Sequence, residues 1–176
     1  MVNLRRLLQA ITEVQDVSKH PALLAAATLE CPNTVRILPS PHPIERYTCL
    51  VHALDFTERP EYVAIAERGF NVVFAGRSFA HWLIDRRLIN EVAAVDANEG
   101  DLVFYFNEER QFQHAGVIAG NHRVISKWGT GHLFEHGLFE VPESYGTIVR
   151  FFQHLASDEA YDHFVTFAKE KGFLFL

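Results

Sequence analysis

The chain has 176 residues, of which 48% are hydrophobic and 15 are Phe, and its formal net charge is -6. This length suits one domain, and so much apolar material excludes a disordered chain. A mildly acidic protein is a poor binder of nucleic acid or of anionic membranes, and no apolar run approaches the ~20 residues that span a bilayer. We therefore expect neither nucleic acid nor a membrane as a partner.

The first residues include basic and apolar side chains, but Gln9 and Glu13 interrupt the apolar pattern. Helical spacing of the apolar residues predicts an amphipathic helix here rather than a signal peptide. The chain has two Cys, too few for a disulfide framework at this length. We expect a reduced, cytoplasmic setting, with export by a route that uses no signal peptide as the alternative.

The start of the chain predicts two helices, over residues 2–18 and 21–30, with Pro21 at the first position of the second one. Residues 31–47 contain four Pro and predict an extended connector. Helical patterns resume after it. They predict a short helix from Thr48 or Cys49 through Leu54, another over Glu61–Glu67, and a third that Ser78 caps and whose apolar side carries Phe79, Trp82 and Leu83.

After Gly100 the pattern becomes that of strands. Strands are predicted over residues 101–106, 114–119, 123–128 and 147–152, with a turn at 120–122. A last helix follows, capped by Ser157 and ending before Gly172. Helices that precede strands indicate an α+β fold rather than alternating βαβ units. We expect a single domain with a helical N-terminal extension (1–45), a core (46–155) and a C-terminal helix (156–172).

Cys49 and His114 are the candidate catalytic residues. A catalytic Cys must ionise, and a helix N-terminus or a nearby imidazolium lowers its pKa. Thr48 would cap the short helix and place Cys49 in its first turn. His114 would open a strand of small and apolar residues, which would hold its ring rigidly toward a cleft. Taken singly, each residue is more simply a core thiol or a structural His.

The order of these pieces resembles the NlpC-type cell-wall hydrolases and amidases of the papain-like clan. Gly100–Phe106 matches that family's first strand, His114–Ile118 its second, and Gly120–Ile125 its turn and return strand. The resemblance implies a papain-like, NlpC-like fold with helices packed on a small antiparallel sheet. It also implies that Cys49 is the nucleophile and His114 the base, and it places Ser126 at the third polar position.

The activity implied is a cysteine hydrolase, an amidase or peptidase, that needs no cofactor or metal. His114 would take the proton of Cys49, and the thiolate would attack an amide carbonyl in a peptide or a peptidoglycan-type fragment. An alternative is a papain-like binding module that has lost its chemistry.

A third class is a zinc hydrolase, because His132–His136 spells the H-x-x-E-H pattern. That pattern requires a helix, whereas the surrounding Gly residues favour a loop or short strand with surface His. Cys31, a rival nucleophile, follows a helix end, where the helix dipole would raise its pKa, so we expect it to be structural. His52 shares the helical face of Cys49, and a surface or packing role is expected for it.

Overall fold

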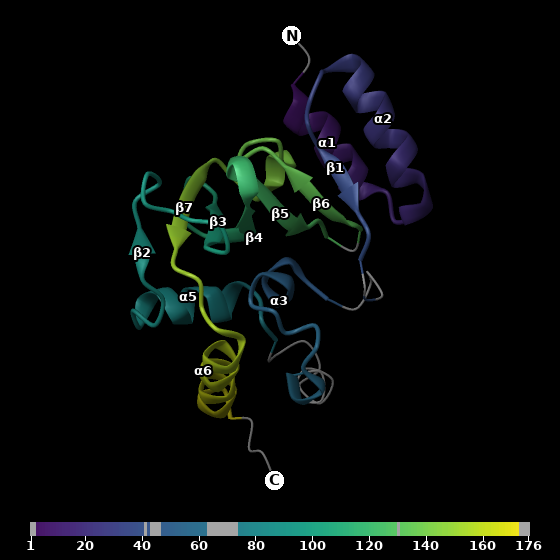
Figure 1. Ribbon diagram of the computed structural model, residues 1–176. Coiled ribbons are helices and arrows are strands. Elements are labelled where there is room, and N and C mark those ends of the chain that lie inside the picture. The colour runs from purple at the N-terminus through teal and green to yellow at the C-terminus, as the bar shows by residue number, and fades with distance from the viewer. Residues whose placement is uncertain (1–2, 41, 43–46, 63–73, 130, 173–176) are drawn as a thin grey trace.

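The computed structural model describes residues 3–40, 42, 47–62, 74–129 and 131–172 (Figure 1). Its helices are α1 (Leu4–Glu13), α2 (His20–Glu30), α3 (Cys49–Ala53), α5 (Arg77–Asp85) and α6 (Ser157–Glu170), with 3-10 turns η1 (Val17–Lys19), η3 (Gly120–His122) and η4 (Glu143–Tyr145). Its strands are β1 (Arg36–Leu38), β2 (Glu91–Val92), β3 (Leu102–Phe106), β4 (Phe112–Ala119), β5 (Arg123–Lys127), β6 (Leu133–His136) and β7 (Ile148–Phe152). The predicted α+β class is confirmed.

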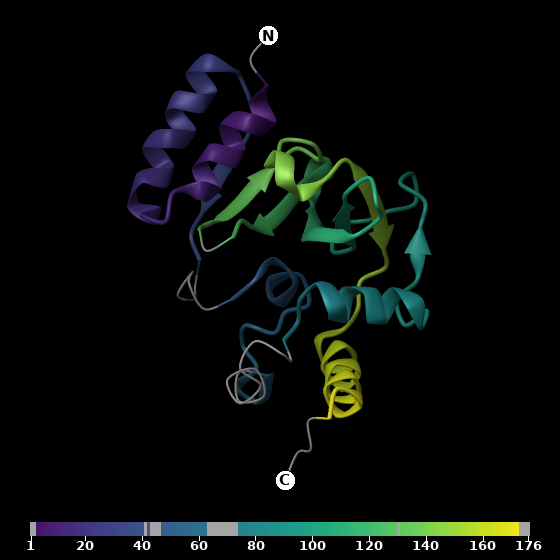
Figure 2. The same cartoon turned by 180° about the vertical axis from the view of Figure 1, so that it is seen from behind.

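The strands form one sheet in the order β1-β6-β5-β4-β3-β7-β2, and neighbouring strands are antiparallel. Helices α3, α5 and α6 lie on one side of this sheet (Figures 1 and 2). Helices α1 and α2 lie beside β1, the strand at one edge of the sheet. No described helix is long and apolar enough to cross a membrane.

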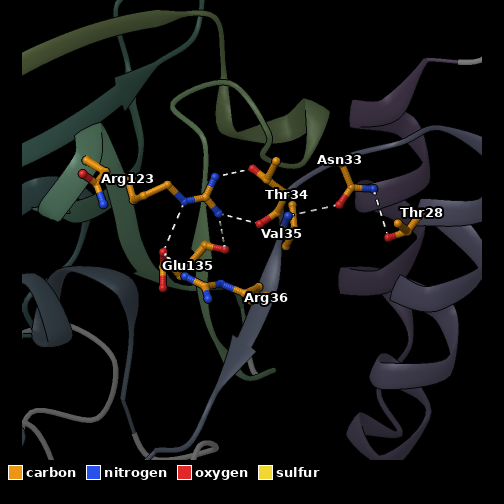
Figure 3. A pocket seen from close by; sticks show the side chains of 8 residues that line it. Thr28, Asn33, Thr34, Val35, Arg36, Arg123 and Glu135 are labelled. Carbon is orange, nitrogen blue, oxygen red and sulfur yellow. Dashed lines mark hydrogen bonds and ion pairs between the residues drawn. The ribbon is translucent and has the colours of Figure 1, made fainter.

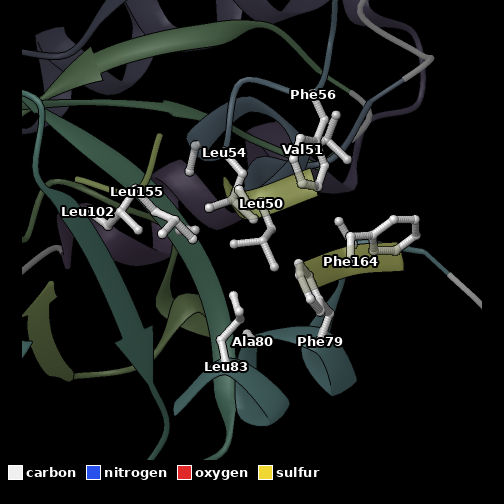
Figure 4. Packing of buried hydrophobic residues seen from close by; sticks show 14 of the residues in the cluster. Leu50, Val51, Leu54, Phe56, Phe79, Ala80, Leu83, Leu102, Leu155 and Phe164 are labelled. Carbon is white, nitrogen blue, oxygen red and sulfur yellow. The ribbon is translucent and has the colours of Figure 1, made fainter. Parts of the chain in front are cut away.

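Two apolar cores lie on opposite faces of the sheet, because successive residues of a strand point to opposite sides. Phe104 and Phe106 of β3 belong to the first core, which packs Leu50 of α3, Phe79 of α5 and Phe164 of α6 together (Figure 4). Val103 and Tyr105 belong to the second core, which includes Leu8 and Ile11 of α1 and Trp128.

The short helix predicted at Thr48 or Cys49 is present as α3, with Thr48 as its cap. The predicted helix at Glu61–Glu67 lies almost wholly outside the described residues. The first helix ends at Glu13 rather than at residue 18, and Pro21 occupies the second position of α2 rather than the first.

The predicted caps of α5 and α6 were wrong. Gly76 caps α5, so Ser78 lies inside the helix. Ala156 caps α6. The hydroxyl of Ser157 instead donates to the carbonyl of Asp55 at 3.0 Å and accepts from Arg59 Nε at 2.8 Å. The side chain therefore links the start of α6 to the loop after α3.

The connector at 31–47 contains a strand that the sequence pattern did not indicate. Arg36–Leu38 forms β1, which pairs with β6 from Leu133 to Glu135. Arg36 Nη2 also donates to a carboxylate oxygen of Glu135 at 2.6 Å. The N-terminal extension therefore completes one edge of the sheet.

Candidate functional site

Cys49 is the first residue of α3, and its side chain is half-buried. The Thr48 hydroxyl accepts a hydrogen bond from Val51 N at 3.4 Å, which fixes the start of the helix as the sequence predicts. Helix α3 packs against β4 and β5. It therefore brings the thiol to the strand that carries His114.

The ladder between β4 and β5 runs only from Ala119/Arg123 to Val117/Ile125. Ala115 and Lys127 lie beyond its end, and both act on the Cys49 thiol at the start of α3. The backbone N–H of Ala115 points to the Cys49 sulfur and lowers the pKa of the thiol. The thiol is thus placed where β4 and β5 stop pairing.

Burial is the largest influence on Cys49 and raises the pKa of the thiol above its usual value. The backbone N–H groups of Ala115, Leu50 and Cys49 and the charge of Lys127 act in the opposite direction and do not outweigh burial. This corrects the expectation that the helix terminus alone would leave a depressed pKa. The physical reason is that burial outweighs the N–H groups at the start of a helix of only 5 residues.

His114 is buried in β4, with 1% of its surface exposed. It pairs in register with Tyr105, so both side chains project from the same face of the sheet. Its ring stacks on that of Tyr145, with 3.8 Å between ring centroids and 12° between ring planes. Burial, followed by the charges of His136, His52 and Lys127, holds the pKa of His114 well below its usual value.

Nε2 of His114 is buried and has no hydrogen-bond partner in the described part of the chain. The hydroxyl oxygen of Tyr145 is also buried, and the backbone N–H of Gly129 approaches it and lowers the pKa of Tyr145. Burial raises the pKa of Tyr145 well above its usual value, and the charge of Cys49 raises it further. The Tyr145 ring therefore stacks on His114, and the charge of Cys49 acts on the pKa of the Tyr145 hydroxyl.

Cys49 and His114 share this environment without being hydrogen-bonded to each other. Lys127 acts on the pKa of both, and His52, one turn after Cys49 on α3, acts on that of His114. Burial lowers the pKa of His52 to about 4, so its ring is neutral at pH 7. The sequence places Cys49 and His114 65 residues apart. The fold brings both near Lys127, in a group that also holds His52, His136 and Tyr145 and is called the Cys49 cluster below.

Ser126 is fully buried on β5, but its partner is His136 rather than His114. The Gly137 carbonyl, 2.8 Å from His136 Nδ1, can only accept, so Nδ1 carries the proton. Nε2 must then accept from the Ser126 hydroxyl, 2.8 Å away, while Trp128 Nε1 donates to the same hydroxyl at 3.0 Å. Burial lowers the pKa of His136 to about 4, which keeps this ring neutral.

The H-x-x-E-H segment is not a helix. Its last four residues form β6, and His136 is fully buried, which corrects the expectation of a surface His. His132 Nε2 lies 3.1 Å from the Val17 carbonyl, which requires it to donate. No group of three metal-binding side chains occurs among the described residues. Two His on one helical face, which the zinc pattern requires, are therefore not formed.

Cys31 caps the end of α2, as expected, and its N–H donates to the Ala27 carbonyl at 2.8 Å. It lies outside the Cys49 cluster. Three residues of that cluster had no role in the sequence-based site: Tyr145, Lys127 and His136. Strand alternation separates Lys127 from Ser126, but nothing in the pattern signals that Tyr145 packs on His114.

An open pocket of about 470 Å³ lies elsewhere, between α2, β1 and the turn before β5 (Figure 3). Arg123 crosses it, with Nε 3.2 Å from a Glu135 carboxylate oxygen and Nη2 2.5 Å from the Thr34 carbonyl. Neither Cys49 nor His114 lines it. Arg123, Glu135 and Thr34 bind one another in this pocket, which is separate from the site around Cys49 and His114.

No curated protein and no solved structure matches the chain. One family model does match, described as "Domain of unknown function (DUF7689)", over residues 41–153. The matched segment includes Cys49, His114, Ser126, His136 and Tyr145, and it leaves out α1, α2, β1 and α6. Because the match covers more than half of the 176 residues, the chain belongs to the DUF7689 family.

Proposed function

We propose that this protein is a cysteine hydrolase that cleaves an amide bond, with Cys49 as nucleophile and His114 as general base. The observation that carries the proposal is the buried, unpartnered Nε2 of His114, whose ring stacks on Tyr145, the residue whose pKa the charge of Cys49 raises. Leaving a buried polar atom unpaired costs about 1–3 kcal/mol, and catalytic groups are a common reason for that cost. In the proposed reaction, this nitrogen accepts the proton of the Cys49 thiol.

In the proposed proton transfer, the two charges must form together as a pair. Burial opposes charging either group alone, since it raises the pKa of Cys49 and lowers that of His114. Moving the proton from Sγ to the imidazole leaves the pair with no net charge, so the desolvation penalty is smaller than for one isolated ion. The backbone N–H groups of Ala115 and Leu50 then stabilise the thiolate.

The chemistry follows from these roles. The thiolate attacks the substrate carbonyl and forms a C–S bond, and the C–N bond breaks as the imidazolium of His114 returns its proton to the leaving amine. Water, deprotonated by His114, then attacks the thioester and releases the acid and the free thiol. Ser126 has no part in this sequence, because its hydroxyl is committed to His136.

The NlpC-type resemblance of residues 100–128 supports a peptide or peptidoglycan-type amide as substrate, and a cytoplasmic site of action is part of the proposal. A papain-like binding module without chemistry is the second candidate. The raised pKa of Cys49 favours it, because a thiol that stays protonated is a poor nucleophile.

Acyl-enzyme formation with 4-nitrophenyl acetate separates the two candidates. Intact-mass and peptide analysis should find an acetyl group on Cys49, and the Cys31→Ala variant should acylate as the wild type does. Cys49→Ala should show no thioester and His114→Ala a slow one. Acetylation of Cys31 and Cys49 at equal rates would leave the binding module as the better account.

A further inference from the structure

The turn that carries Tyr145 is held tightly against β3. Gly146 follows Tyr145 with φ of 91°, a left-handed conformation that favours Gly. A Cβ added there would lie 2.1 Å from the Phe106 carbonyl oxygen, so no larger residue fits. Thr147 N donates to that same carbonyl at 3.1 Å. The backbone on the far side of Tyr145 is thus fixed to the end of β3.

The near side of the turn is fixed by Arg5, which lies in the first turn of α1. Its Nε donates to the Val141 carbonyl at 3.1 Å, and its Nη2 donates to the carbonyls of Pro142 at 3.0 Å and Gly146 at 2.5 Å. One guanidinium therefore ties together the backbone on both sides of η4. A planar group with five N–H donors is well suited to this, and Lys is not.

Arg6, the next residue, makes a different kind of contact. Its Nε donates to the Glu143 side chain at 3.2 Å, and 76% of the Arg6 side chain is exposed. Such a pair contributes little and touches no backbone of the turn. Arg6 therefore offers a matched control for Arg5 on the same helix.

We propose that Arg5 and Tyr145 are positioning residues of the Cys49–His114 site: Arg5 of α1 fixes the 141–146 turn, and the turn holds the Tyr145 ring against His114. This inference rests on the proposed function and extends it to the N-terminal helix, which lies outside the segment that matches the family. The flat stack, 3.8 Å between centroids, fixes the plane of the imidazole, and with it the direction of Nε2.

Labelling of Cys49 with iodoacetamide tests the proposal in the full-length protein. Each variant is made with and without the additional change His114→Ala. The quantity measured at pH 7 is the Cys49 labelling rate with His114 divided by the rate with His114→Ala. We expect Tyr145→Leu and Arg5→Ala to reduce this ratio at least fivefold. Tyr145→Phe, which keeps the ring, and Arg6→Ala should retain it within twofold.

Ring ¹⁵N NMR of His114 provides a readout that does not depend on catalysis. The His114 signals should move in Tyr145→Leu and Arg5→Ala and stay in place in Tyr145→Phe and Arg6→Ala. If His114→Ala has no effect on Cys49 even in the wild type, the proposed function fails, and the NMR pattern still decides the positioning roles. Unchanged His114 signals in Tyr145→Leu, or a loss in Tyr145→Phe as large as in Tyr145→Leu, would overturn them.

Discussion

The hydroxyl of Ser126 donates to Nε2 of His136 across 2.8 Å in the second core of the protein. The same hydroxyl accepts from Trp128, and His136 passes the interaction on to the Gly137 carbonyl. The side-chain polar atoms of Ser126, Trp128 and His136 therefore all have hydrogen-bond partners. This network links β5 to β6 without leaving an unsatisfied group. Ser126, which the NlpC-type resemblance places at the third polar position, therefore stabilises the pairing of β5 with β6.

Ser126→Ala should destabilise the protein by about 1–3 kcal/mol, because His136 Nε2 and Trp128 Nε1 lose their buried partner. The reactivity of Cys49 should be unchanged. Urea denaturation and iodoacetamide labelling measure the two effects. Ser18→Ala, which removes an exposed hydrogen bond to Asp16, should change stability by less than ~0.5 kcal/mol. A Ser126→Ala variant of normal stability whose Cys49 no longer depends on His114 would restore Ser126 to the catalytic group.

Stability should fall as the pH drops from 7 to 5, because buried neutral histidines must charge when the protein unfolds. Burial lowers the pKa of His52 and of His136 to about 4, against about 6.5 in an unfolded chain. Between these values the unfolded state binds more protons, so each histidine removes about 2 kcal/mol of stability by pH 5.

Urea denaturation at pH 7 and pH 5 measures this loss. His136→Gln should lose less stability than the wild type over the same interval, whereas the exposed His122→Gln should lose as much as the wild type. A stability that does not change between pH 7 and pH 5 would argue against buried, neutral rings at these positions.

Gly146→Ala should destabilise the protein by more than about 3 kcal/mol, because it adds backbone strain and a direct clash with the Phe106 carbonyl. Gly100 has a similar φ of 93° and open space around its Cα. Gly100→Ala should therefore cost only about 1–2 kcal/mol, the strain alone. Thermal or urea denaturation of the two variants compares them directly, and equal losses would contradict the packing of the Tyr145 turn against β3.

Lys127 is fully buried and donates to the Gly129 carbonyl at 2.8 Å, with its ammonium 5.1 Å from the Tyr47 ring. Its charge lowers the pKa of Cys49 and that of His114. Lys127→Met, which keeps most of the side-chain volume, should raise both. The pH midpoint of Cys49 labelling should then move upward, while that of Cys31 stays constant. Exposed Lys19→Met should leave both midpoints alone, and an unmoved Cys49 midpoint in Lys127→Met would show that the charge does not reach the thiol.

Local patterns predicted the parts of the fold that depend on near neighbours in the sequence. A continuous apolar run located β3, the apolar residues after the turn at 120–122 located β5, and Thr48 before an apolar run located the start of α3. Strand β1 was missed because it has only 3 residues, and its pairing with β6 depends on a segment about 100 residues away. Caps were misplaced by one or two residues where a Gly or an Ala begins the helix in place of the nearby Ser.

The candidate site was predicted only in part, for the same reason. Cys49 and His114 are residue types whose chemistry can be read from the sequence, and the structure places them in one cluster. The partner of Ser126 depends on the register of β5 against β6, and the contact of Tyr145 with His114 depends on how Arg5 and Gly146 fold the turn. The raised pKa of Cys49 follows from burial, which no local pattern reveals.

The pH dependence of iodoacetamide labelling at Cys49 and Cys31, with His114→Ala as control, tests the central claim most directly. If Cys49 and His114 exchange a proton, Cys49 should label at least tenfold faster than Cys31 at pH 6–7, and His114→Ala should shift its profile to higher pH, to or beyond the ordinary thiol value of about 8.5. If both thiols label slowly and alike, and His114→Ala changes neither, Cys49 and His114 are not a catalytic pair.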